Sequence, residues 1–100
     1  MVKHIILWTL KDEFSNTEKQ EIKNNIKAGL EGLLGVVPGL TEIKVNINPL
    51  PTSNVDLMLN SSFESFEALK SYAHHPAHVD VADNLVSPYT ESRSCIDFEV

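Results

Sequence analysis

Histidine is the side chain best suited to proton transfer near neutral pH, and three of the four histidines fall within residues 74–78. His75 and His78 are three residues apart, so they share one face if this stretch is helical. Tyr72 precedes them and could supply a phenolic proton to a developing enolate oxygen. This stretch is therefore the first candidate for acid–base chemistry on a carbonyl compound.

His4 and Asp97 are a second candidate pair, near opposite ends of the chain. His4 alternates with Ile6 and Trp8 in an apolar N-terminal stretch. Asp97 lies in a C-terminal stretch that the expected fold pairs with this N-terminal stretch. We expect His78 to approach His4 and Asp97 from a helix layer. A carboxylate that orients an imidazole fixes its tautomer and makes it a better base. The same polar side chains could instead serve packing specificity, and spacing by itself favours that structural role.

Metal binding is an alternative for the histidine stretch. Its spaced histidines and nearby acids offer nitrogen and oxygen ligands: His75, His78, Asp80 and Asp83. The spacing matches no established zinc motif, and the nitrogen ligands are few. We therefore expect no metal and no cofactor. Cys95 is the single cysteine, which excludes an internal disulfide, and we expect a small buried side chain rather than a nucleophile.

Four segments have the pattern of β-strands. Residues 2–10 contain a continuous apolar run, which suits a strand buried on both faces. Residues 40–48, 55–61 and 94–100 place apolar side chains at alternate positions, which is typical of half-buried strands.

Two longer helices and one short helix are expected between the strands. Ser15 and Glu18 form a capping box. The helix that follows has an apolar stripe: Ile22, Ile26, Leu30, Leu33 and Leu34. Ser62 is expected to cap a second helix that runs to about Tyr72, and Pro76 suits the first turn of the short helix.

This element order matches the ferredoxin-like (βαββαβ) α+β plan, in which helices cover one face of a sheet. Ile96 and Phe98 would remain on the other face, together with one of the N-terminal isoleucines, Ile5 or Ile6. A patch of this kind is too apolar to be left in water. We therefore expect residues 1–100 to form a single domain that pairs with a second copy by two-fold symmetry. A monomer with a modest exposed patch is the alternative.

The overall composition limits the partners. The formal net charge of −6 disfavours nucleic-acid phosphates and anionic membrane surfaces. The longest N-terminal apolar run, residues 5–8, is too short for a signal peptide or a membrane span. A single cysteine suits a reduced compartment. We expect a cytoplasmic homodimer that binds neither nucleic acid nor membrane.

Several motifs stand in a recognisable order along nearly the whole chain. Lys3-His4 opens the first strand, Val37-Pro38-Gly39-Leu40 precedes the second, His75-Pro76-Ala77-His78-Val79 follows Tyr72, and Asp97-Phe98-Glu99 lies near the end. This set resembles the stress-responsive dimeric α/β barrel (Dabb) family. The resemblance implies a ferredoxin-like protomer and a two-fold dimer whose sheets form a barrel.

That family includes a plant enzyme that closes a linear polyketide by intramolecular aldol condensation without a cofactor. By this likeness His78 would be the base, Asp97 would hold it, and Tyr72 would polarise the reacting carbonyl. The candidate wall of the small-molecule pocket comprises His4, Ile6, Trp8, Leu59, His75, Tyr89 and Cys95.

Three functions stay open at this point. The first is a homodimer that binds a small molecule and acts as a cofactor-free acid–base enzyme similar to a polyketide cyclase. The second is a non-catalytic, stress-associated dimerisation module whose histidines are architectural. The third is a cofactor-free monooxygenase or isomerase with the same plan. A cavity that reaches both His78 and Tyr72 would favour the first, and a filled interior with His78 bonded to backbone would favour the second.

Overall fold

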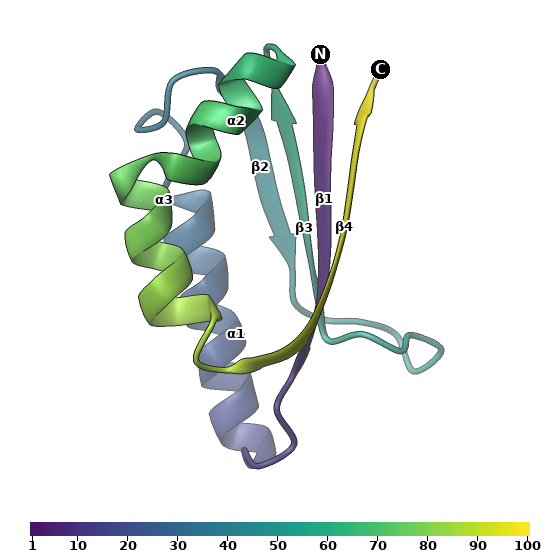
Figure 1. Cartoon of the computed structure of the whole chain (residues 1–100). Helices are drawn as coiled ribbons and strands as arrows, with labels where there is room; N and C mark the ends of the chain where they lie inside the picture. Colours follow the sequence, from purple (N-terminus) through teal and green to yellow (C-terminus); the bar gives the residue numbers. More distant parts are fainter.

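In the computed structural model, residues 1–100 form a four-stranded antiparallel sheet with helices on one face (Figure 1). In chain order the elements are β1 (Val2–Leu10), α1 (Asn16–Glu31), β2 (Leu40–Asn46), β3 (Leu57–Phe63), α2 (Phe66–His74), α3 (Pro76–Val81), the π-helical turn η1 (Ala82–Val86) and β4 (Thr90–Glu99). The strand order is β2-β3-β1-β4. The predicted ferredoxin-like α+β fold is therefore confirmed.

The helix-facing side of β1 forms the floor of the core. Side chains alternate across a strand, so every second residue of β1 points under the helices. These residues are buried: Val2, His4, Ile6, Trp8 and Leu10. Ile26 of α1 and Phe63 of β3 are fully buried against this layer. His4 thus lies in a row of core positions, as the sequence alternation predicts.

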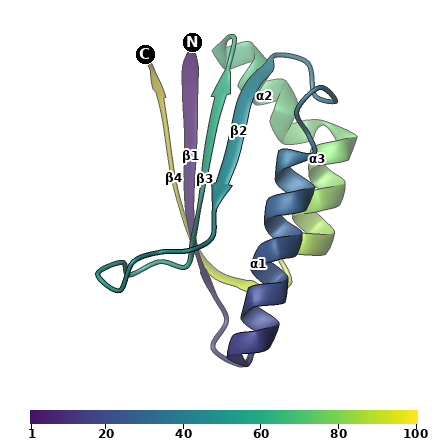
Figure 2. The ribbon, with the colours of Figure 1, turned by 180° about the vertical axis from the view of Figure 1, so that it is seen from behind.

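No helix covers the opposite face of the sheet (Figures 1 and 2). Ile96 and Phe98 of β4 are 60% and 42% exposed on it. Ile5 pairs with Ile96 and shares this face, whereas Ile6 is buried beneath the helices, which settles the choice between the two isoleucines. The connector 47–56 projects from the same side, away from the helices (Figure 2). The predicted bare apolar face is therefore present in the single chain.

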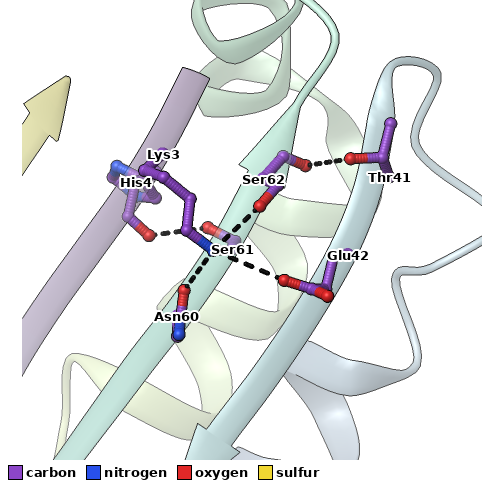
Figure 3. A network of polar contacts seen from close by, with 7 residues as sticks. All are labelled: Lys3, His4, Thr41, Glu42, Asn60, Ser61 and Ser62. Carbon is purple, nitrogen blue, oxygen red and sulfur yellow. Dashed lines mark hydrogen bonds and ion pairs between the residues drawn. The ribbon is translucent and has the colours of Figure 1, made fainter. Parts of the chain in front are cut away.

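The part of the bare face over β2 and β3 is polar (Figure 3). Lys3 Nζ donates to Asn60 Oδ1 at 2.9 Å and to Ser62 Oγ at 3.0 Å, and it lies 3.4 Å from Glu42 Oε1. On the helix side of the same strands, Ser61 Oγ donates to the carbonyl of His4 at 2.8 Å. The bare face is thus divided into an apolar part over β1 and β4 and a polar part over β2 and β3.

The first helix begins as predicted. The hydroxyl of Ser15 accepts from the Glu18 N–H at 3.2 Å, and the Glu18 carboxylate accepts from the Ser15 N–H at 2.9 Å. Leu34 is 50% exposed, so its predicted place on the apolar stripe is wrong; α1 has ended before this residue. A Cβ on Gly29 would lie 2.7 Å from Leu85 Cδ1, which shows that the glycine allows η1 to pack closely on α1.

Several predicted strand boundaries are wrong. β2 ends at Asn46 rather than at residue 48, and β3 begins at Leu57 rather than at residue 55. Elsewhere strand pairing extends further than the alternation suggests. β3 continues to Phe63, where it is paired with both β1 and β2. Ser65, rather than Ser62, therefore caps α2 and accepts a hydrogen bond from its first turn. β4 begins at Thr90, well before residue 94, because Thr90 is already paired with Leu10.

Candidate functional site

A cavity of about 190 Å³ lies between the helix-facing side of the sheet and the segments α2, α3 and η1. Strands β1, β3 and β4 supply the sheet side of its wall, and the helices supply the other side. From the set expected from the sequence, the wall contains His4, Ile6, Trp8, Leu59, Tyr72 and His78. The interior is therefore not filled, and the cavity reaches both His78 and Tyr72.

Tyr72 of α2 and His78 of α3 lie against each other on the helix side of this cavity. Their ring centroids are 4.1 Å apart and the rings are inclined by 37°. The hydroxyl of Tyr72 and Nδ1 of His78 are buried and form no hydrogen bond within the chain. Buried polar groups without partners destabilise a folded protein and are rare. Two of them on one cavity wall indicate a place suited to a polar ligand atom.

Burial sets the protonation of both groups. Desolvation lowers the pKa of His78, and the backbone of Ala73 opposes this shift only in part. The positive charge of Arg93 lowers the pKa of His78 further, whereas the carboxylate of Asp83 raises it. Desolvation also raises the pKa of Tyr72. At neutral pH the cavity therefore presents a neutral imidazole, which can accept a proton, beside a phenol that remains a hydrogen-bond donor.

Asp97 holds His4, not His78, and this corrects the partner expected from the sequence. His4 and Asp97 are directly opposite in the register of β1 and β4. Oδ1 of Asp97 is hydrogen-bonded to Nδ1 of His4. This bond favours the tautomer that carries its proton on Nδ1 and leaves Nε2 as an acceptor. The His4 ring lies 6.1 Å from that of Tyr72, so a carboxylate-held imidazole faces the phenol from the sheet side.

Two residues of the expected wall lie elsewhere. Nδ1 of His75 accepts a hydrogen bond from the Ala77 N–H at 3.1 Å and so caps α3. Tyr89 packs its ring 5.7 Å from that of Phe14, beside α1 rather than beside the cavity. Both residues are used to shape the helix layer.

Cys95 is also absent from the cavity wall, and it is exposed rather than buried because the helices do not extend over β4. Partial desolvation and the nearby Asp97 carboxylate raise the pKa of its thiol, which makes it a weak nucleophile. The ligand-type atoms of His4, Cys95 and Asp97 lie within 4.8 Å of one another. These residues, and not the acids near His78, form the cluster that could hold a metal. An ion there would have to break the hydrogen bond between His4 and Asp97.

Part of the wall was not predicted: Leu30, Leu69, Ala73, Ala82, Val86, Ser87, Thr90 and Arg93. Most of these residues belong to helices whose rotation the sequence does not specify, and Ala82 and Val86 belong to the π-helical turn. Arg93 could have been found, because it alternates with Cys95 and Asp97 on one face of β4.

Comparison with known proteins places the chain in a family. The sequence model of the family described as the stress responsive A/B barrel domain, Dabb, matches residues 2–100. The chain belongs to the Dabb family. The family expected from the motifs is thus confirmed. Among solved structures, a dimeric protein of unknown function and ferredoxin-like fold from Bacteroides fragilis is 33% identical, with a TM-score of 0.92. The match covers 99% of this Dabb chain and 95% of that chain.

Two plant proteins are related to this Dabb chain in sequence. A stress-response A/B barrel domain-containing protein of Arabidopsis thaliana is 28% identical over 98% of the chain, which spans only 36% of that plant protein. Olivetolic acid cyclase of Cannabis sativa is 27% identical over 82% of the chain and 80% of the cyclase. None of the helices in this Dabb protein combines the length and apolar character that a membrane crossing requires.

Proposed function

We propose that this Dabb protein is a homodimer, with residues 1–100 as a single domain, that binds a small molecule in the cavity between helices and sheet. We propose further that it performs cofactor-free acid–base chemistry on a carbonyl compound there. One observation carries the proposal: Tyr72 and His78 line a cavity with buried polar atoms that have no partner in the chain. The similarity to the Cannabis sativa protein named olivetolic acid cyclase supports the same kind of chemistry.

The proposed reaction begins with removal of a proton from the carbon next to a carbonyl group. The neutral imidazole of His78 accepts this proton, since the lowered pKa keeps it unprotonated at neutral pH. The electron pair of the C–H bond forms a C=C bond while the π pair of the carbonyl group moves onto its oxygen, which accepts a hydrogen bond from Tyr72. His4, oriented by Asp97, offers a second proton acceptor from the sheet side. The enolate can then attack a second carbonyl or be protonated again.

The bare face of the sheet supports the homodimer. Ile96 and Phe98 are exposed large apolar side chains, and Ile5 extends the same patch. Covering such a patch removes apolar area from water, which stabilises by about 25 cal/mol per Å². The Bacteroides fragilis protein, 33% identical, is described as dimeric. A second copy of this chain, related by two-fold symmetry, is the occupant we propose.

Exchange of α-protons provides a test that does not require the natural substrate. Acetophenone in D₂O carries exchangeable methyl protons, and proton NMR records their loss with time. We expect the protein to accelerate this exchange over buffer. The variant His78→Ala should abolish the acceleration, and Tyr72→Phe should reduce it by about 10²-fold or more, the usual effect of losing one oxyanion donor.

A matched histidine change controls for folding and for free imidazole catalysis. His74 is exposed at the end of α2 and does not line the cavity. The variant His74→Gln should therefore exchange acetophenone at the wild-type rate. Exchange no faster than in buffer, or equal exchange by His78→Ala and the wild type, would remove the acid–base proposal. The non-catalytic dimerisation module would then be the better description.

A further inference from the structure

The wall of the cavity carries an unbalanced charge. Arg93 is the only arginine or lysine that lines the cavity, and no aspartate or glutamate lines it. This is notable in a chain with a net charge of −6, where acidic side chains outnumber basic ones 14 to 8. If charged side chains lined the cavity in proportion to their numbers in the chain, an acidic side chain would be expected there. Among the lining residues, Arg93 therefore supplies the only permanent charge, in a protein that is negative overall.

Arg93 lines the cavity from the edge strand β4. Arg93 pairs with Trp8 across β1 and β4, and it belongs to the helix-facing side of β4 together with Asp97. It is exposed, because the helices do not extend over this strand, and it takes part in none of the ion pairs of the chain. Asp97, on the same strand face, is bonded to His4. The side chain of Arg93 lies against the thiol of Cys95 rather than in an ion pair. Arg93 thus remains available to bind an anionic group on the part of the cavity wall that the edge strand β4 supplies.

The remainder of the wall restricts the body of the ligand. Most lining side chains are apolar, including Ile6, Leu30 and Leu59. A dry cavity of about 150 Å³ is known to accept benzene, so about 190 Å³ accepts a single ring or a short acyl chain that carries one further group. The polar atoms without partners belong to Tyr72 and His78. The site therefore combines an apolar wall for the body of the ligand, a pair of polar side chains for a carbonyl group and a separate cationic side chain.

We propose that the cavity selects small carboxylate-bearing carbonyl compounds, that is, oxo acids with a compact apolar body. Arg93 binds the carboxylate, and Tyr72 with His78 receives the carbonyl group. The carbonyl part of this inference rests on the proposed function, whereas the carboxylate part rests on Arg93 alone. Arginine suits this role because its planar guanidinium can bind both oxygens of a carboxylate.

Three probes of the same shape and different charge test the carboxylate part: benzoate, benzamide and benzamidinium. We expect benzoate to bind about fivefold more tightly than benzamide, the upper range for an exposed ion pair, and benzamidinium to bind most weakly. Calorimetric titration or NMR shifts of the cavity residues measure the three affinities. Added salt should weaken the binding of benzoate and leave the binding of benzamide unchanged.

Variants locate the effect. Arg93→Leu should bind benzoate and benzamide about equally, and Arg93→Lys should retain most of the preference for benzoate. Lys23→Leu removes the same charge from α1, away from the cavity wall, and should leave the preference intact. Equal binding of benzoate and benzamide to the wild type, or a benzoate preference that survives in Arg93→Leu, would overturn the inference.

The two proposals fail in different ways. Acetophenone carries no carboxylate, so its exchange tests His78 and Tyr72 without the ion pair that Arg93 is proposed to form. A benzoate preference without acetophenone exchange upholds the carboxylate site and removes the acid–base chemistry. Acetophenone exchange without a benzoate preference upholds the chemistry and removes the carboxylate site.

Discussion

Replacing Tyr72 by phenylalanine should make this protein more stable, which is the reverse of the usual effect of changing a core residue. The ring of Tyr72 is 1% exposed and packs 4.9 Å from that of Phe63, a contact that phenylalanine preserves. The hydroxyl is buried without a partner, and a buried unsatisfied polar group costs about 1–3 kcal/mol. Removing it should therefore raise the free energy of unfolding by about 1 kcal/mol or more.

The change is large enough to measure. For a domain of this size, 1 kcal/mol moves the melting temperature by about 4–8 °C. Trp8 is the single tryptophan and lies on the cavity wall, so its fluorescence during urea unfolding reports directly on this region. All samples need the same protein concentration, since the stability of a dimer depends on it. Acetophenone exchange measured on the same samples should fall as stability rises.

The other tyrosine is the matched control. Tyr89 is partly buried beside Phe14 and is not among the residues with buried unpartnered atoms, so Tyr89→Phe should change stability by much less. A loss of 1 kcal/mol or more in Tyr72→Phe would refute the reasoning. It would mean that the hydroxyl of Tyr72 is hydrogen-bonded in the native protein and that this side of the cavity is architectural.

Three further outcomes are expected. Burial lowers the pKa of His78 from about 6.5, so the unfolded chain binds the proton at a higher pH than the folded chain, and the free energy of unfolding should fall as pH drops below that value. His78→Ala should flatten this part of the plot of unfolding free energy against pH. An unchanged slope of that plot would contradict the pKa shift. Ile96→Lys on the bare face should shift sedimentation from dimer to monomer. Leu34→Lys, at a residue of similar exposure in the turn after α1, should not. A dimer that persists in Ile96→Lys places the interface elsewhere. Gly39→Ala should destabilise the protein by more than Gly35→Ala, which costs about 1 kcal/mol. Both glycines have positive φ (82° and 84°), but only a Cβ on Gly39 would meet a side chain of α2, at 2.5 Å. Equal losses of unfolding free energy in urea titration would contradict this.

The strand-based parts of the site could be predicted from the sequence, because alternation and pairing follow a fixed geometry. His4 and Asp97 lie on the expected faces of two adjacent strands, and the register brings them into contact. The helix-based parts depend on how α3 rotates over the sheet. For that reason the sequence did not indicate that His78 faces Tyr72 without a partner while His75 caps the helix.

Cap positions and cavity size are also set by the folded whole. Ser62 and Ser65 are both acceptable caps in sequence, and pairing of β3 with two neighbours decides between them. The volume of the cavity is the small space left after all the surrounding side chains have packed, so no single residue indicates it. Arg93 differs from these, since strand alternation alone places it on the face of β4 that carries Asp97.

β4 has a consequence for how binding preference can change in such a protein. On this strand Arg93 is exposed and Thr90 is only partly buried, so both contribute little to the folding free energy, yet both line the cavity. Mutations there alter which molecules are admitted while the scaffold keeps its stability. Because these lining residues lie on an edge strand, a few surface substitutions can change the ligand while the fold stays stable.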